Sequence, residues 1–112
     1  MAYDQGLAER VREYLRKRDD VVEKKMFGGL TFMVRDYMAC GLTKDNFMVR
    51  VDKEKYQTYL QEPHASEMDF TGRALKGMLY IEPEGIEDDG ELIKWIDRSL
   101  DFVDSLPTKI VK

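Results

Sequence analysis

The chain has 112 residues, 43% hydrophobic and 36% charged, a composition typical of one globular domain that excludes a largely disordered chain. Its formal net charge of −4 excludes the strongly basic balance of most nucleic-acid-binding domains, and the acidic residues concentrate in residues 82–112, with nine Asp/Glu against four Lys/Arg. There is no apolar run long enough for a membrane span, no signal peptide at the N-terminus and only one cysteine, so we expect a cytoplasmic protein without disulfides.

The first half of the chain predicts a helix followed by a run of strands. Apolar residues recur at helical spacing over residues 5–18, and Asp4 precedes them as an N-cap. From residue 21 the hydrophobic period changes to two, and glycine-, aspartate- and asparagine-containing turns interrupt it. The predicted strands form an antiparallel meander over residues 22–27, 30–35, 38–43 and 47–51.

The second half predicts a short helix, one more strand and a long final helix. Asp52 is placed to cap a helix over residues 53–61. A strand is expected at residues 78–82, and Asp88 is the predicted N-cap of a helix that ends before Pro107.

Residues 62–77 lie between the short helix and this last strand, and they show no sustained hydrophobic period. The segment contains Pro63, Gly72 and Gly77, which interrupt regular structure. Loops of this length are uncommon in compact domains and are usually functional or mobile. Loop 62–77 is therefore a candidate site.

The order of these elements predicts the α+β class. We expect a two-layer sandwich in which an antiparallel sheet of about five strands is covered by helices at both termini and by one crossover helix. The domain is expected to occupy residues 1–107, with residues 108–112 as a short C-terminal tail.

Each motif that would carry catalysis or metal binding is incomplete. Gly28-Gly29 leads into a strand, which favours a hairpin turn over a dinucleotide site, and residues 72–77 have P-loop glycine spacing but are followed by Met78 instead of lysine. Cys40 is in phase with apolar strand residues and His64 follows a proline, which favours a buried thiol and a hydrogen-bonding loop residue over a nucleophile and base. We expect no enzymatic activity, no cofactor and no metal.

Strand alternation places apolar side chains on the sheet face opposite the main core. This predicted methionine face carries Met33, Met48, Met78 and Tyr80, beside Arg35 and Arg50. Methionines form adaptable contact surfaces, so the face is either a homodimer or partner surface, or ordinary packing beneath a helix of the same chain.

Several short motifs are shared with one protein family. They are Lys24-Lys25-Met26-Phe27-Gly28-Gly29, Phe32-Met33, Met48-Val49-Arg50-Val51, Met68-Asp69-Phe70-Thr71-Gly72-Arg73 and Lys76-Gly77. With them the chain resembles, from residue 2 to residue 107, the N-terminal domain family of the TfoX/Sxy regulators of bacterial natural competence. The resemblance implies a two-layer α/β domain of a cytoplasmic, non-enzymatic transcriptional co-regulator whose protein partner is the cAMP receptor protein or other transcription machinery. Two-domain members continue into a helical C-terminal domain, whereas this chain stops at Lys112 and looks like a stand-alone version.

The family pattern transfers no catalytic residue. Its matching positions are Lys25, Met26, Phe27, Gly28, Gly29, Arg50, Gly72, Arg73 and Gly77. Two arrangements of the basic residues stay open: Lys25, Arg50, Arg73 and Lys76 converge in a basic patch, or they pair with Asp69 and Glu67.

The predicted function is a regulatory or protein-interaction domain. The alternative is a small ligand- or peptide-binding module, or a homodimeric domain, that uses loop 62–77 and the sheet face. Because the chain is acidic, we expect no specific binding of duplex DNA by the isolated domain. Because it has no long apolar run, we expect no membrane association.

Overall fold

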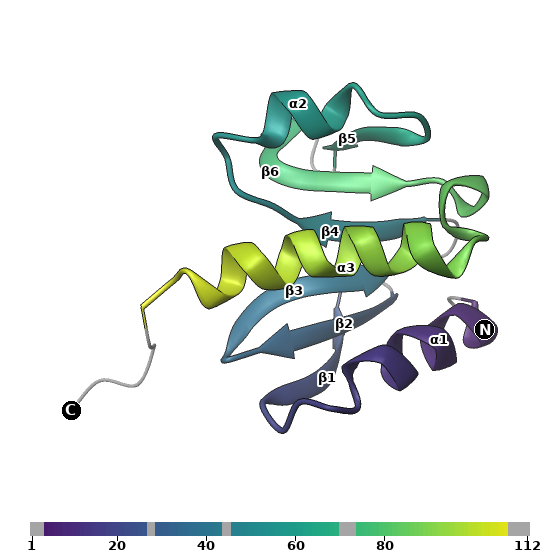
Figure 1. The fold of residues 1–112 in the computed structure, drawn as a ribbon, viewed down its shortest axis with the longest axis vertical. Helices are drawn as coiled ribbons and strands as arrows, with labels where there is room; N and C mark the ends of the chain where they lie inside the picture. The colour runs from purple at the N-terminus through teal and green to yellow at the C-terminus, as the bar shows by residue number, and fades with distance from the viewer. Residues whose placement is uncertain (1–3, 27–28, 44–45, 70–73, 108–112) are drawn as a thin grey trace.

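The computed structural model describes residues 4–26, 29–43, 46–69 and 74–107 (Figure 1). A six-stranded antiparallel sheet has the order β1-β2-β3-β4-β6-β5. Its strands are β1 (Val21–Met26), β2 (Gly29–Val34), β3 (Tyr37–Leu42), β4 (Phe47–Arg50), β5 (Ala65–Asp69) and β6 (Ala74–Ile81). The predicted α+β class is confirmed, with one strand more than expected.

Both long helices begin where the sequence predicts. The Asp4 carboxylate accepts a hydrogen bond from the Leu7 N–H at the start of α1 (Gln5–Leu15), and Asp88 does the same for Glu91 at the start of α3 (Asp89–Asp104). α1 ends at Leu15 and not at residue 18. The structure describes no helix that is both long and apolar enough to cross a membrane.

The four-strand meander of β1 to β4 is confirmed to within a residue at each boundary. Arg35 and Asp36 have φ angles of 54° and 70° between β2 and β3. Positive φ at two central residues is the geometry of a tight hairpin turn whose twist matches that of the flanking strands.

The prediction that residues 62–77 lack regular structure is wrong. Within this segment lies β5, and β6 already begins at Ala74, with Ala65 opposite Ile81. β5 is an edge strand whose Ser66 and Glu67 side chains are exposed, so it shows no apolar alternation. Gly77 lies inside β6 at φ +89°, a glycine that the sequence pattern suggested was part of a loop.

The crossover helix is shorter than predicted. α2 spans Tyr56–Leu60, whereas the expected helix covered residues 53–61. The Asp52 carboxylate accepts a hydrogen bond from the Glu54 N–H at 2.8 Å, so Asp52 caps the turn before the helix and not the helix itself.

The main core lies between the sheet and the helices α1 and α3, which cover the same sheet face (Figure 1). Strand residues such as Phe32 and Phe47 pack there with Val11 of α1 and with Trp95 and Ile96 of α3, and all five are at most 1% exposed. The 3-10 helix η1 (Pro83–Ile86) connects β6 to α3 and adds Ile86 to this core.

Candidate functional site

Two of the four residues of the predicted methionine face are buried, and Met33 and Tyr80 are half-buried. Met48 is fully buried and Met78 is 7% exposed, and these two form a second apolar cluster against which Met38 and Tyr80 pack. The expected homodimer or partner surface stays a prediction, but Met48 offers no exposed area to it.

Contrary to expectation, the guanidinium groups of Arg35 and Arg50 do not lie beside these methionines. Arg35 donates a hydrogen bond from Nη1 to the Val103 carbonyl oxygen of α3 at 2.7 Å. The Arg50 guanidinium lies 5.3 Å from the centre of the Phe102 ring, also on α3. Each arginine stands at a strand end, where a long side chain reaches around to the helical side of the sheet.

The basic patch expected from four lysines and arginines is not formed by Lys25 and Arg50. Lys25 is exposed on the edge strand β1, and Arg50 lies three strands across and three residues further along, about 17 Å away at normal strand spacings. Arg73 lies outside the described residues. Lys76 lies in β6 and Asp69 lies in β5. Pairing of the basic residues with Asp69 or Glu67 stays a prediction.

One glycine of the shared turn motif has a clear structural role. A Cβ atom at Gly29 would overlap the Leu42 carbonyl oxygen, so only glycine allows β2 and β3 to approach here. Phe27 and Gly28 of the motif, and Gly72 of the second motif, lie outside the described residues. Met26 ends β1, opposite Gly29.

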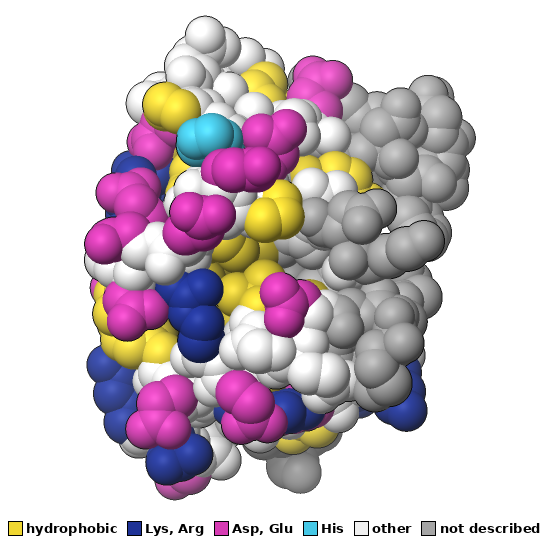
Figure 2. Space-filling model, turned by 90° about the vertical axis from the view of Figure 1, so that its right-hand side faces the viewer, with side chains coloured by type: hydrophobic (Ala, Val, Ile, Leu, Met, Phe, Trp, Pro, Cys, Tyr) yellow, Lys and Arg dark blue, Asp and Glu magenta, His cyan; other side chains and the backbone are white. Residues whose placement is uncertain are grey.

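A cleft of about 740 Å³ opens at the end of the sheet where α1 begins and β6 leads into η1. Leu42, Phe47 and Ile86 contribute to its apolar lining. Carboxylates line its rim, namely those of Asp4, Glu82, Glu84 and Glu87. Figure 2 shows hydrophobic side chains inside a hollow with acidic side chains around it. We call this feature the acidic cleft.

The acidic cleft has an excess of negative charge among the described residues. Arg10 is the one cation they contribute to its lining, and Arg10 binds Asp89 at 2.8 Å and the Glu87 carbonyl oxygen at 3.2 Å. Among the residues that the structure describes, neither the Glu84 nor the Glu87 carboxylate has a hydrogen bond or an ion pair. The cleft is therefore suited to a positively charged group with an apolar portion.

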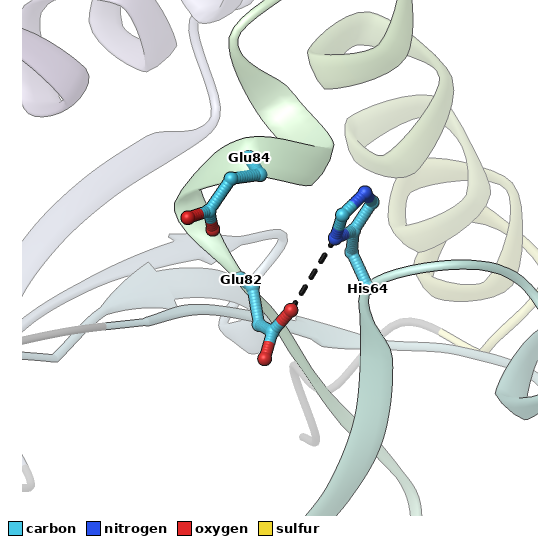
Figure 3. A group of neighbouring side chains, drawn as sticks. All are labelled: His64, Glu82 and Glu84. Atoms are coloured by element: carbon cyan, nitrogen blue, oxygen red, sulfur yellow. Dashed lines mark hydrogen bonds and ion pairs between the residues drawn. The ribbon is translucent and has the colours of Figure 1, made fainter.

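At the rim of the acidic cleft, His64 meets two of these glutamates (Figure 3). Nδ1 of His64 lies 3.3 Å from Oε1 of Glu82, and one ligand atom each from His64, Glu82 and Glu84 lie within 4.8 Å of one another. All three side chains are exposed. Of the described residues, these are the ones whose donor atoms could hold a metal ion.

The single thiol is unsuited to nucleophilic catalysis, as predicted. Cys40 is buried in β3, and burial raises its pKa to about 12. The thiol is therefore protonated and inaccessible at neutral pH.

The acidic cleft was not predicted, although the sequence carries a signal for it. Nine acidic residues in residues 82–112 indicated an acidic surface, but its position depends on three distant segments that meet only in the fold. Asp4 precedes α1, Asn46 lies in the connection before β4, and Glu87 lies between η1 and α3.

The family model of the TfoX N-terminal domain matches residues 13–103, most of the chain. The chain belongs to the TfoX N-terminal domain family. This confirms the resemblance drawn from the sequence motifs, and the family is not one of known enzymes. No curated protein and no solved structure matches the chain.

Proposed function

We propose that this TfoX N-terminal-domain protein is a non-enzymatic, cytoplasmic regulatory domain that acts by binding another protein through the acidic cleft. The observation that carries the proposal is the combination of unpaired carboxylates at the rim, such as those of Glu84 and Glu87, with an apolar interior. A basic segment of a partner satisfies both features, because its charged ends pair at the rim while its methylene groups contact the interior.

The family supports a role in transcriptional regulation. TfoX-type regulators act in competence, and the cAMP receptor protein is the partner that membership of this family points to. The acidic cleft is complementary to a basic surface of such a partner, whereas it repels the phosphates of DNA. We therefore propose contact with a DNA-binding protein and no specific contact with DNA.

The experiment is a calorimetric titration of the purified chain with purified cAMP receptor protein at physiological salt. Charge reversal of Glu84 and Glu87 together to lysine should weaken binding by at least about tenfold, because like charges then face each other. Glu13→Lys is the control, since Glu13 lies on α1 outside the acidic cleft and is exposed. Equal binding by the cleft variant and the control would contradict the role of the cleft, and no binding at all would contradict this partner.

The volume of the acidic cleft favours a second candidate, a module that binds a small cationic ligand. About 740 Å³ lies within the range of small-molecule sites. This candidate requires that the chain bind an organic polyamine such as spermidine at low millimolar concentration or below. The variant with Glu84 and Glu87 both replaced by lysine should lose at least about tenfold in affinity for the polyamine. The ligand site expected in loop 62–77 rested on a long irregular loop. That segment contains β5 and part of β6, so the argument for a site there no longer holds.

A further inference from the structure

We propose that His64, Glu82 and Glu84 form a binding site for a divalent transition-metal ion of the Zn²⁺ type at the rim of the acidic cleft. The imidazole comes from the residue before β5, one carboxylate from the residue after β6 and the other from η1 (Figure 3). His64 lies 18 residues before Glu82, so the sequence shows no metal-ligand spacing that joins the histidine to the two glutamates. The inference does not depend on the proposed protein partner.

The distances agree with the size of such an ion. Two ligands of a tetrahedral Zn²⁺ ion, each bonded at about 2.0–2.1 Å, lie about 3.3 Å apart. The Nδ1 atom of His64 and the Oε1 atom of Glu82 are 3.3 Å apart, and one ligand atom from each of His64, Glu82 and Glu84 lies within 4.8 Å of the other two. The Glu84 side chain is exposed, so it can rotate toward an ion held by the other two ligands.

The backbone holds the ligand residues in place independently of their charges. The Glu82 N–H donates to the His64 carbonyl oxygen at 2.9 Å, which extends the pairing of β5 with β6 by one residue. Gly85 is needed on the other side, since a Cβ atom there would lie 2.7 Å from Cβ of His64. A side chain at residue 85 would push η1, and Glu84 with it, away from the imidazole.

The donor set determines the class of ion. One imidazole with two carboxylates suits Zn²⁺, Co²⁺ or Ni²⁺ better than Mg²⁺ or Ca²⁺, which prefer oxygen ligands alone. Two carboxylates balance the charge of the ion. With three protein ligands, a further coordination position stays open toward solvent, where a water molecule or a group of a bound partner can ligate.

The test is a titration of the chelator-treated full chain with Zn²⁺ alone, followed by proton NMR and calorimetry. His64 is the only histidine in the sequence, so its ring signals are assigned without any variant. We expect one Zn²⁺ ion per chain in the micromolar range and a shift or broadening of these ring signals at the same stoichiometry. Ring signals that do not change up to saturation would overturn the proposal.

Variants separate a built site from general attraction of cations to an acidic surface. His64→Ala and Glu82→Gln should each weaken Zn²⁺ binding by at least about tenfold, the loss typical even for residues that only support a metal ligand. Glu87→Gln is the matched control, because it removes a carboxylate of the same cleft that is not part of the group, and it should leave the affinity unchanged. An equal loss in Glu87→Gln, or equal affinity for Mg²⁺ and Zn²⁺, would overturn the site.

Discussion

The Arg98 guanidinium of α3 binds the Glu62 carboxylate at 2.8 Å and thereby ties the segment after α2 to α3. The same guanidinium lies over the rings of Tyr59 and Trp95, with distances of 4.1 and 4.6 Å to the ring centres. Lys94 donates to Glu62 as well, at 3.1 Å. Glu62 is therefore the electrostatic link between the crossover segment and the final helix.

Replacement of Glu62 by glutamine should make the free energy of unfolding less dependent on pH in the acid range. Burial of Glu62 favours the neutral form, but hydrogen bonds from Arg98 and Lys94 outweigh it and lower the pKa of Glu62 below the usual value. A lowered folded-state pKa contributes stability that is present above the usual glutamate pKa and is lost as pH falls through the folded value.

At pH 7, Glu62→Gln should therefore lower the free energy of unfolding by about 1 kcal/mol, as expected for a partly exposed pair. The difference in the free energy of unfolding between this variant and the wild type should disappear as the pH falls below about 4. Urea unfolding between pH 7 and pH 3 measures both. Glu13→Gln, which removes an exposed pair with Arg16, is the control and should change stability little. A difference for Glu62→Gln that persists unchanged at pH 3 contradicts the ion-pair explanation.

Gly29→Ala should be one of the most destabilising small substitutions in the chain. Its Cβ atom would overlap the Leu42 carbonyl oxygen, and backbone atoms cannot rotate away as a side chain can. We expect a loss of about 2 kcal/mol or more in the free energy of unfolding. Gly6→Ala is the matched control, because the Asp4 side chain, at 3.3 Å, is all that a Cβ atom there meets among the described residues, and alanine favours helix. Equal stabilities of the two variants would show that β2 and β3 separate easily at Gly29.

Local signals predicted the elements well, because caps and alternation depend on near neighbours. Asp4 and Asp88 bond to N–H groups three residues ahead, and the sequence contains that information directly. β5 was missed because an exposed edge strand has no apolar period, and only its pairing with β6 defines it.

The site could not be predicted, for a different physical reason. Its residues converge through sheet register and the position of η1, as with His64 and Glu82, which are neighbours only because β5 pairs with β6. Arg35 and Arg50 show a related limit. Alternation fixes the direction of Cβ, but a long side chain at the end of a strand can reach either face.

Cys40 should react with a thiol reagent such as DTNB only through unfolding. The thiol is buried and its pKa is raised to about 12, so native protein presents little thiolate. The check is the labelling rate at pH 8 in buffer, compared with the rate in guanidinium chloride. If unfolding limits the reaction, Gly29→Ala should accelerate labelling in proportion to its loss of stability. Fast labelling of the native wild type would contradict the buried position of Cys40.

The methionine face offers a direct contrast between a buried and a half-buried methionine. Met48 is fully buried, and a Cβ atom at the neighbouring Gly41 would lie 2.6 Å from its terminal methyl group. Met33 lies on the same side of β2 as Thr31 and is half-buried. Met33, unlike Met48, therefore has surface to offer a second copy of the chain.

Met48→Glu should strongly destabilise the domain, whereas Met33→Glu should leave its stability nearly unchanged. A glutamate at position 48 would be buried without a partner, a change that costs about 4 kcal/mol or more, against a total stability of about 5–15 kcal/mol for a domain of this kind. Thermal unfolding followed by circular dichroism tests this contrast, and equal melting temperatures of the two variants would contradict the burial of Met48. Sedimentation equilibrium of the same samples tests the predicted homodimer. If wild type dimerises through this face, Met33→Glu should be a folded monomer, whereas a wild type that is monomeric at every concentration rules the homodimer out.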